Sequence, residues 1–173
     1  ENYVYVSGTS PVFVKHFENY ARDVIKTYQP SINYLILDIG SNDGTLLKFF
    51  KKMGYKTLGI DPAIDISKKA QNDGIDTIND FFNLKTSEKI KEKYSEASLI
   101  TANNVFAHSD DLIEIVKAVK NLLSPEGLFI FEVSYLLDVY QKTLFDTIYH
   151  EHLSYHSVLP LIKFFQTYDM ELI

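Results

Sequence analysis

The chain has 173 residues, a formal net charge of −6 and 46% hydrophobic residues, which together indicate a single globular domain with a sizeable core. Arg22 is its only arginine, and this acidic balance excludes the basic surface that nucleic-acid binding requires. Cysteine is absent, so disulfides and thiolate metal sites are excluded. No apolar run reaches the length of a membrane span and no signal peptide is visible, so we expect no membrane partner and a cytoplasmic location.

The hydrophobic pattern predicts strands and helices in alternation. A first helix begins at Ser10-Pro11, where an N-cap serine precedes proline, and it ends before Pro30. Buried strands are expected at residues 34–39, 57–60, 76–78, 97–102 and 128–133. Helices are expected at residues 46–53, 64–72, 85–94 and 110–123, with a turn at 124–127 after the last of these. Further on, helices are predicted at 136–145 and 158–168, and a final strand begins at 171.

Alternating strands and helices predict an α/β fold, with a mostly parallel, doubly wound sheet covered by helices on both faces. Because the last strand has barely begun at residue 173 and the chain starts at Glu1 rather than Met, we expect a piece of a longer protein, truncated at its last strands. Residues 11–173 are expected to form the domain. Residues 1–10 read as a lead-in segment that contributes to an active-site lid.

A glycine-containing motif, Asp38-Ile39-Gly40-Ser41-Asn42-Asp43-Gly44, follows the first predicted strand and opens a helix. Gly40 permits a tight turn and a close approach of the backbone to a ligand, while the helix start presents free N–H groups. Asn42 stands where a dinucleotide-binding pattern has its second glycine, and this bulkier side chain fits a pyrophosphate poorly. The motif therefore predicts a nucleoside-containing cofactor other than a dinucleotide.

Polar residues also follow the next three predicted strands. Asp61, in Gly59-Ile60-Asp61-Pro62, can accept both hydroxyl groups of a ribose. Asp80 and Phe81 follow the third strand, where a carboxylate and an aromatic ring could frame an adenine. Asn103 follows the fourth strand at the same sheet edge.

These features together resemble the class I S-adenosylmethionine (SAM) methyltransferases, which have a Rossmann-like fold. The resemblance implies that SAM is the cofactor and that Asn103 faces its methionine end. The cofactor-binding residues that it implies are Asp38, Gly40, Ser41, Asn42, Gly44, Asp61, Pro62, Asp80, Phe81 and Asn103. The run Asn103-Asn104-Val105-Phe106 lacks the Asn-Pro-Pro-aromatic signature of DNA amino methyltransferases.

The run Tyr149-His150-Glu151-His152-Leu153-Ser154-Tyr155-His156 holds three of the five histidines of the chain. It lies between the fifth strand and the next helix, at the carboxyl edge of the sheet, where open α/β folds place their ligands. His108 follows the fourth strand and opens onto the same edge. Such a cluster can move protons near neutral pH and hold a developing enolate oxygen.

This run resembles the signature of the sugar C-methyltransferases, which act on nucleotide-linked keto-deoxysugars. Thr9-Ser10-Pro11, the glycine motif and Asn103–His108 fit the same family. The resemblance implies that His152 is the base, that Tyr149, Glu151 and His108 are the other active-site residues, and that Tyr3 or Tyr5 lies near the acceptor. The family also carries a cysteine-rich zinc domain before this region and a further domain after it. Since neither is present here, the 173 residues alone are expected to transfer methyl groups slowly or not at all.

Three other interpretations remain open from the residues. His150 and His152 could bind a metal ion with His108 and Glu151, which would indicate a metal-dependent isomerase or hydrolase. The histidines could instead be hydrogen-bonded structural groups, or the chain could bind SAM without catalysis of its own. We expect no metal in this chain, and we expect His16 and His156 to be packing or helix-surface residues.

Overall fold

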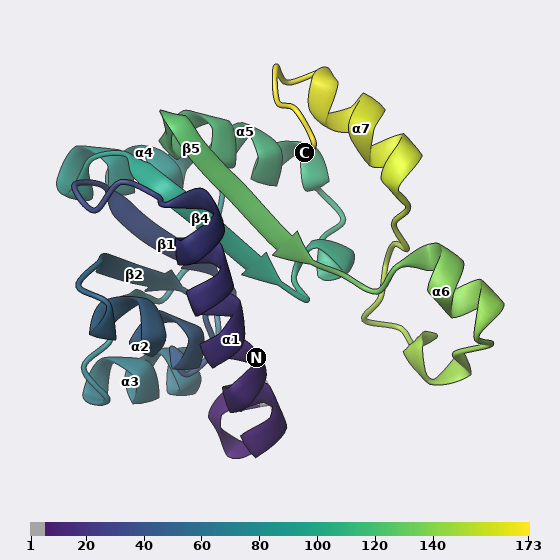
Figure 1. The fold of residues 1–173 in the computed structure, drawn as a ribbon, viewed down its shortest axis with the longest axis horizontal. Helices are drawn as coiled ribbons and strands as arrows, with labels where there is room; N and C mark the ends of the chain where they lie inside the picture. Colours follow the sequence, from purple (N-terminus) through teal and green to yellow (C-terminus); the bar gives the residue numbers. More distant parts are fainter. Residues whose placement is uncertain (1–5) are drawn as a thin grey trace.

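The computed structural model describes residues 6–173, so Tyr3 and Tyr5 lie outside the described residues. Its centre is a five-stranded sheet with the strand order β3-β2-β1-β4-β5, in which every pairing is parallel (Figure 1). The strands are β1 (Leu35–Ile39), β2 (Lys56–Ile60), β3 (Thr77–Ile78), β4 (Ala97–Asn103) and β5 (Leu123–Glu132). The order reverses between β1 and β4, which places a topological switch point at their carboxyl ends.

Helices cover both faces of the sheet, as the sequence predicts. The helices are α1 (Pro11–Tyr28), α2 (Thr45–Lys52), α3 (Ile64–Asn72), α4 (Leu84–Tyr94), α5 (Leu112–Leu122), α6 (Leu136–Gln141) and α7 (Val158–Gln166). Ser10 is the N-cap of α1, where its side chain accepts a hydrogen bond from the backbone N–H of Phe13. This cap and Pro11 at the first helical position explain why α1 begins where the sequence predicts.

The core consists of two clusters separated by the sheet. Because successive side chains of a strand point to opposite faces, Leu35 and Leu37 pack with α4, α5 and α7, while Ile36 packs with α1, α2 and α3. All three side chains are buried. This burial on both faces explains the continuous apolar run that identified β1 in the sequence.

The sequence predicts a separate turn at residues 124–127, and this prediction is wrong. Helix α5 ends at Leu122 and β5 begins at once, with Ala97 paired to Leu123 and Leu99 paired to Leu128. Residues 124–127 therefore form an irregular, bulged start of the strand. Gly127 makes this possible, since a Cβ atom there would lie 2.8 Å from the carbonyl oxygen of Ala97.

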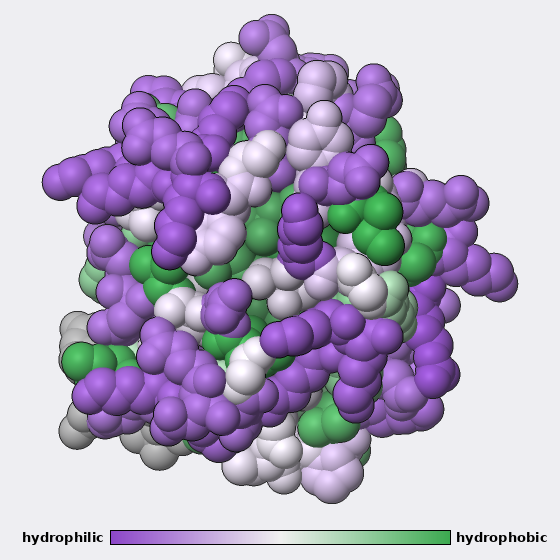
Figure 2. Space-filling model, turned by 90° about the vertical axis from the view of Figure 1, so that its left-hand side faces the viewer, coloured by the Kyte–Doolittle hydropathy of each residue, from purple (hydrophilic) through white to green (hydrophobic). Residues whose placement is uncertain are grey.

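The chain beyond β5 departs most from the sequence prediction. The predicted helix at 136–145 is shorter, ending at Gln141, and is followed by a 3₁₀ turn, Phe145–Thr147. No strand forms at 171–173. Helix α6 extends away from the sheet, while α7 leads the chain back towards α5 (Figure 1). The opposite side of the molecule is covered largely by hydrophilic residues (Figure 2). None of the helices among residues 6–173 has the length and apolar character needed to span a bilayer.

The core assignment predicts a difference between two neighbouring phenylalanines of α2. Phe50 is fully buried, whereas Phe49 is only partly buried. Phe50→Ala should lower the free energy of unfolding by about 3–5 kcal/mol, because it leaves a cavity in the core, and Phe49→Ala should cost clearly less. Urea denaturation of both variants measures this, and equal losses would contradict the packing described here.

Candidate active site

The glycine motif forms a sharp turn between β1 and α2. Gly40 and Gly44 have φ values of 65° and 73°, and Asn42 has a φ of 51°. Only glycine, and less often asparagine, adopts this left-handed conformation at low cost. The turn lies against the loop after β4, because a Cβ atom on Gly40 would be 2.5 Å from Cγ2 of Val105. The motif is therefore specified by backbone conformation and close approach, as the sequence indicated.

Asp61 anchors this turn from the end of β2. One carboxylate oxygen accepts a hydrogen bond from the Asn42 N–H at 2.9 Å, and the other accepts from the Ala63 N–H at 2.8 Å. The residue is buried. An ionised carboxylate has about four lone-pair sites, so two backbone contacts leave room for two hydroxyl donors. Asp61 can therefore hold the turn and still receive a ribose.

Asp38 is the buried acid at the start of the motif. Its carboxylate accepts a hydrogen bond from the Thr101 hydroxyl at 2.6 Å, across the β1–β4 pairing. The pKa of Asp38 is raised to about 7, mainly by burial; the Thr101 hydroxyl opposes this rise, and the Asp61 carboxylate adds a small contribution to it. The contact of Thr101 with Asp38 was not predicted from the sequence. Thr101 precedes Asn103 by two residues in β4, so both side chains lie on the same face of the strand.

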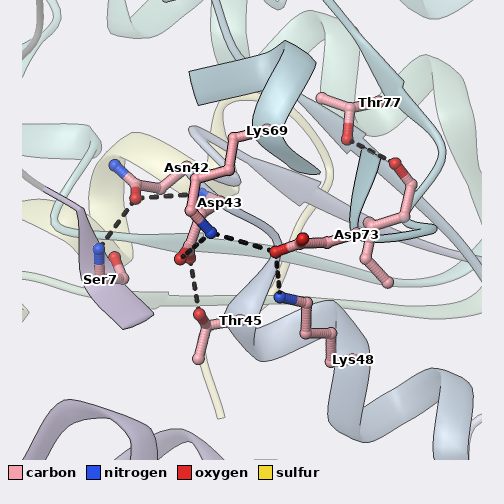
Figure 3. A network of polar contacts seen from close by, with 9 residues as sticks. Ser7, Asn42, Asp43, Thr45, Lys48, Lys69, Asp73 and Thr77 are labelled. Carbon is pink, nitrogen blue, oxygen red and sulfur yellow. Dashed lines mark hydrogen bonds and ion pairs between the residues drawn. The ribbon is translucent and has the colours of Figure 1, made fainter. Parts of the chain in front are cut away.

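A polar network ties the segment before α1 to the glycine turn (Figure 3). The Ser7 N–H donates to Oδ1 of Asn42 at 2.9 Å, which also accepts from the Asp43 N–H. The Asp43 carboxylate in turn accepts from the Thr45 hydroxyl at 2.6 Å and lies 3.5 Å from Nζ of Lys69. The segment that precedes α1 is thus held directly on the predicted cofactor loop.

The remaining predicted cofactor residues lie at the same sheet edge but differ in exposure. Pro62 and Asp80 are exposed, and the Phe81 side chain is 64% exposed after β3. Asn103 differs from them, because both polar atoms of its side chain are buried without a hydrogen-bond partner in the described part of the chain. The hydroxyl of Ser41 is buried without a partner in the same way.

The histidine run forms a hydrogen-bonded cluster around His152. Its Nδ1 lies 2.8 Å from the carbonyl oxygen of Thr147, which also accepts from the Tyr155 hydroxyl at 2.9 Å. A carbonyl oxygen can only accept, so Nδ1 carries the proton in neutral His152. Nε2 is then the basic nitrogen, and the Tyr149 hydroxyl donates to it at 3.0 Å. The His108 ring packs edge-on against His152 at 5.0 Å.

The environment keeps two of these groups in their neutral forms. Burial lowers the pKa of His108, His152 lowers it further, and Glu151 opposes this change. Burial also raises the pKa of the Tyr149 phenol, with smaller contributions from Glu151 and Tyr155. His108 is therefore a neutral imidazole and Tyr149 a protonated phenol at neutral pH.

The cluster is attached to the loop that follows β4. The N–H groups of Leu153 and Ser154 both donate to the carbonyl oxygen of Ala107, at 2.8 and 3.3 Å. Ala107 belongs to the short 3₁₀ helix η2 (Phe106–His108). This helix begins three residues after Asn103, the last residue of β4 that pairs with β5. The structure thus brings His108, Tyr149 and His152 together beside the switch point. Glu151 is exposed nearby. Tyr155 belongs to the run named from sequence but had no role assigned to it, and Thr147 was not recognised from sequence.

A parallel sheet with this strand order, a glycine turn after β1 and an acid after β2 define a Rossmann-like class I methyltransferase fold. The family model described as "Methyltransferase domain" matches residues 16–173. The chain therefore belongs to this family, and SAM is its cofactor.

Individual relatives agree with this assignment. The C-methyltransferase NovU of Streptomyces niveus is 31% identical over 172 residues, covering 99% of this chain and 41% of the relative. A ubiquinone biosynthesis O-methyltransferase of Hydrogenovibrio crunogenus is 26% identical over 126 residues, covering 68% of this chain and 52% of the relative. The chain thus spans about half, or less, of the length of these curated relatives.

Solved structures show the same fold. A SAM-dependent methyltransferase from Archaeoglobus fulgidus superposes with a TM-score of 0.68 at 17% identity, covering 91% of this chain and 72% of that one. Fit to SAM can also be tested on the residues themselves. Ser41, directly after Gly40, and Asn103, at the end of β4, both carry buried polar side-chain atoms without a partner among the described residues, which suits a polar ligand at the switch point.

The raised pKa of Asp38 predicts a pH dependence of stability. Unfolded Asp38 ionises near pH 3.8 and folded Asp38 near pH 7, so between these values only the folded state keeps the proton. Its contribution to stability is therefore complete below pH 3.8 and is lost as the pH rises through 7, by about 1.4 kcal/mol per pKa unit. Asp38→Asn cannot ionise, so its advantage in urea denaturation over the parent should grow from pH 5 to pH 8. A constant difference would contradict the assignment.

Proposed function

We propose that SAM lies across the carboxyl ends of β1, β2 and β4. Asp61 accepts the ribose hydroxyls, the turn at Gly40 receives the chain between ribose and methionine, and Asp80 with Phe81 frames the adenine. When bound, SAM supplies an electrophilic methyl group. The spare lone pairs of Asp61 and the unpartnered atoms of Ser41 and Asn103 support this placement.

Asp61→Ala tests this site. The variant should bind SAM about 1–3 kcal/mol more weakly, the range for hydrogen-bonding groups left without partners. Isothermal titration calorimetry measures the loss. Asp65→Ala removes an exposed acid of the neighbouring α3 and serves as the charge control. Equal SAM affinity in the Asp61 variant and the parent would remove Asp61 from the site.

We further propose that the protein is a C-methyltransferase whose acceptor is a nucleotide-linked keto-deoxysugar. The proposal rests on one observation above all, the fixed tautomer of His152, which leaves a basic Nε2 beside a protonated phenol. Removal of a proton next to a ketone needs such a base and a donor for the enolate oxygen. The relationship to C-methyltransferase NovU supports methyl transfer to carbon.

In the proposed mechanism, the Tyr149 O–H first turns from Nε2 of His152 toward the ketone oxygen of the acceptor, which frees the lone pair of Nε2. Nε2 then takes the proton from the carbon beside the ketone, and His152 becomes an imidazolium whose Nε2–H can donate to the Tyr149 oxygen. The Tyr149 O–H donates to the enolate oxygen that forms. The neutral His108 ring against His152 and the Glu151 carboxylate complete this environment. The enolate carbon accepts the methyl group, and positioning supplies much of the rate.

Two of the three other interpretations from the sequence, the metal centre and the non-catalytic module, receive less support. A metal centre would need His150 and His152 as ligands. The His150 side chain is 91% exposed, and both ring nitrogens of His152 already form hydrogen bonds, to the Thr147 carbonyl and the Tyr149 hydroxyl. No group of three histidine or acidic side chains is placed to hold a metal ion within residues 6–173. A non-catalytic SAM-binding module would leave the His152 tautomer without a purpose.

The segment before α1 also fits the proposal that residues 1–10 contribute to a lid over the site. Its described part contacts the glycine turn through the Ser7–Asn42 hydrogen bond. A side chain at Gly8 would also meet the Asp43 carboxylate, which shows how closely the segment lies on the turn. Residues 11–173 then form the SAM-binding domain itself.

His152→Ala in the complete protein tests the mechanism. Loss of a general base typically lowers the rate by about 10²–10⁴, so kcat for methyl transfer to keto-deoxysugar nucleotides should fall by this factor. SAM affinity should stay nearly unchanged, because the cofactor contacts lie on other loops. A rate assay and SAM calorimetry on the same preparation measure the two effects.

His150→Ala is the matched control, since this neighbouring histidine is 91% exposed and meets the cluster only edge-on, with its ring centroid 6.5 Å from that of Tyr149. It should retain most of the activity. If the His152 variant methylates at the rate of the parent, the base is assigned wrongly, and Glu151 is the next group to test.

A further inference from the structure

The two halves of the histidine run are held to the molecule in different ways. Its second half, residues 153–156, is anchored, because two of its backbone N–H groups donate to the Ala107 carbonyl. His156 is buried, and its ring lies 5.4 Å from that of Phe106 in the core. Nε2 of His156 also lies 3.0 Å from the Ser154 hydroxyl. The anchored half therefore has a fixed position relative to the sheet.

The segment that carries the Thr147 carbonyl, the acceptor of His152, is packed much less well. The side chains of Phe145 and Ile148 on either side of it are 73% and 61% exposed. The hydrogen bonds of this turn are local: the Ile148 N–H donates to the Phe145 carbonyl, and the Thr147 hydroxyl donates to the Leu144 carbonyl. Such bonds shape the turn without fixing its place relative to the sheet.

The Tyr155 side chain joins the exposed turn to the anchored half. Its backbone lies between Ser154 and His156, and its hydroxyl donates to the Thr147 carbonyl at 2.9 Å, eight residues back. A carbonyl oxygen has two lone pairs, so it can accept from Tyr155 and from Nδ1 of His152, 2.8 Å away, at the same time. The Tyr155 ring stands edge-on to the His152 ring, with centroids 6.0 Å apart. Tyr155 therefore ties the acceptor of His152 to the anchored half.

The place of the Thr147 carbonyl decides which nitrogen of His152 is basic. In a neutral imidazole one nitrogen carries the proton and the other a lone pair, and the hydrogen bond at one nitrogen selects the form. With the carbonyl in place, Nδ1 carries the proton and the lone pair is on Nε2. Without it the Nε2–H form becomes available, in which Nε2 donates to the Tyr149 oxygen and cannot take a proton from the acceptor.

We propose that Tyr155 is a positioning residue, which holds His152 in the Nδ1–H tautomer by fixing the Thr147 carbonyl. It acts on the reaction through His152 and not on the reacting atoms. The two tyrosines of the run then have separate roles, because Tyr149 meets the basic nitrogen and Tyr155 determines which nitrogen is basic. The effect on the tautomer does not depend on the substrate, whereas the effect on the rate rests on the function proposed above.

The first test measures the tautomer by NMR on the full chain and needs no substrate. Isotope-labelled ring nitrogens give different correlation patterns for the Nδ1–H and Nε2–H forms, and His152→Gln identifies the signals of His152 by their loss. In mildly alkaline solution, where imidazoles are neutral, the parent should show the Nδ1–H form. Tyr155→Phe should shift the ratio of the two forms toward Nε2–H by roughly two- to tenfold, the range for one neutral hydrogen bond.

Thr147→Val is the matched control for this measurement. It removes the hydrogen bond from the Thr147 hydroxyl to the Leu144 carbonyl but leaves the backbone acceptor of Tyr155 in place. The ratio of the two forms should therefore stay that of the parent. If Tyr155→Phe also keeps the parent ratio, or if both variants change it to the same extent, the positioning role of Tyr155 is overturned.

Rate measurements on the complete protein connect the tautomer to the chemistry. Tyr155→Phe should lower kcat for methyl transfer to keto-deoxysugar nucleotides by roughly two- to tenfold, with the KM of the acceptor nearly unchanged. Tyr140→Phe makes the same change at an 82% exposed position of α6 and should keep the parent kcat. If Tyr155→Phe shifts the tautomer and leaves kcat intact, the assignment of His152 as the base fails, while the positioning of its ring by Tyr155 stands.

Discussion

The active site depends on the loop that joins β4 to α5, because this loop contacts both halves of the site. On one side Val105 packs against Gly40, and on the other the carbonyl oxygen of Ala107 accepts the N–H groups of Leu153 and Ser154. The glycine turn and the histidine run are more than a hundred residues apart in sequence. Both contact the same short stretch, from Val105 to Ala107. The distance between the glycine turn and the histidine run is therefore set by one short segment anchored to the central strand β4.

The site also shows where stability is given up for binding. Asp38 is buried with a pKa raised to about 7, and the polar atoms of Ser41, Tyr20 and Asn103 lack partners in the described part of the chain. Each of these features destabilises the folded protein. They gather at the carboxyl ends of β1 and β4, while the other ends of the strands are packed with apolar side chains. A polar ligand bound at the switch point would satisfy these groups, so ligand binding and folding stability are coupled in this domain.

Much of this arrangement follows from the sequence, because the strands of a parallel sheet are buried on both faces and read as apolar runs. The positions of the strands, of Gly40 and of Asp61 follow from that pattern and from turn chemistry, whereas the strand order comes from the structure alone. The bulged start of β5 does not, since Ser124-Pro125-Glu126-Gly127 reads as a turn and only its pairing with β4 makes it part of a strand. The role of Thr101 was missed for a similar reason. Its contact to Asp38 lies across two strands, and no local spacing reveals such pairs.

The histidine run illustrates how a precise site can form on a weakly packed segment. Most of the large hydrophobic side chains that are exposed among residues 6–173 lie between 135 and 159, so this part of the chain is held by few core contacts. The geometry of His152 is nevertheless fixed, because the Thr147 carbonyl accepts from both His152 and Tyr155 within the same loop. Local hydrogen bonds thus define the tautomer, and the Ala107 carbonyl defines the position of the whole loop. The tautomer of His152 and the position of its loop are controlled by different contacts, so a change in one need not disturb the other.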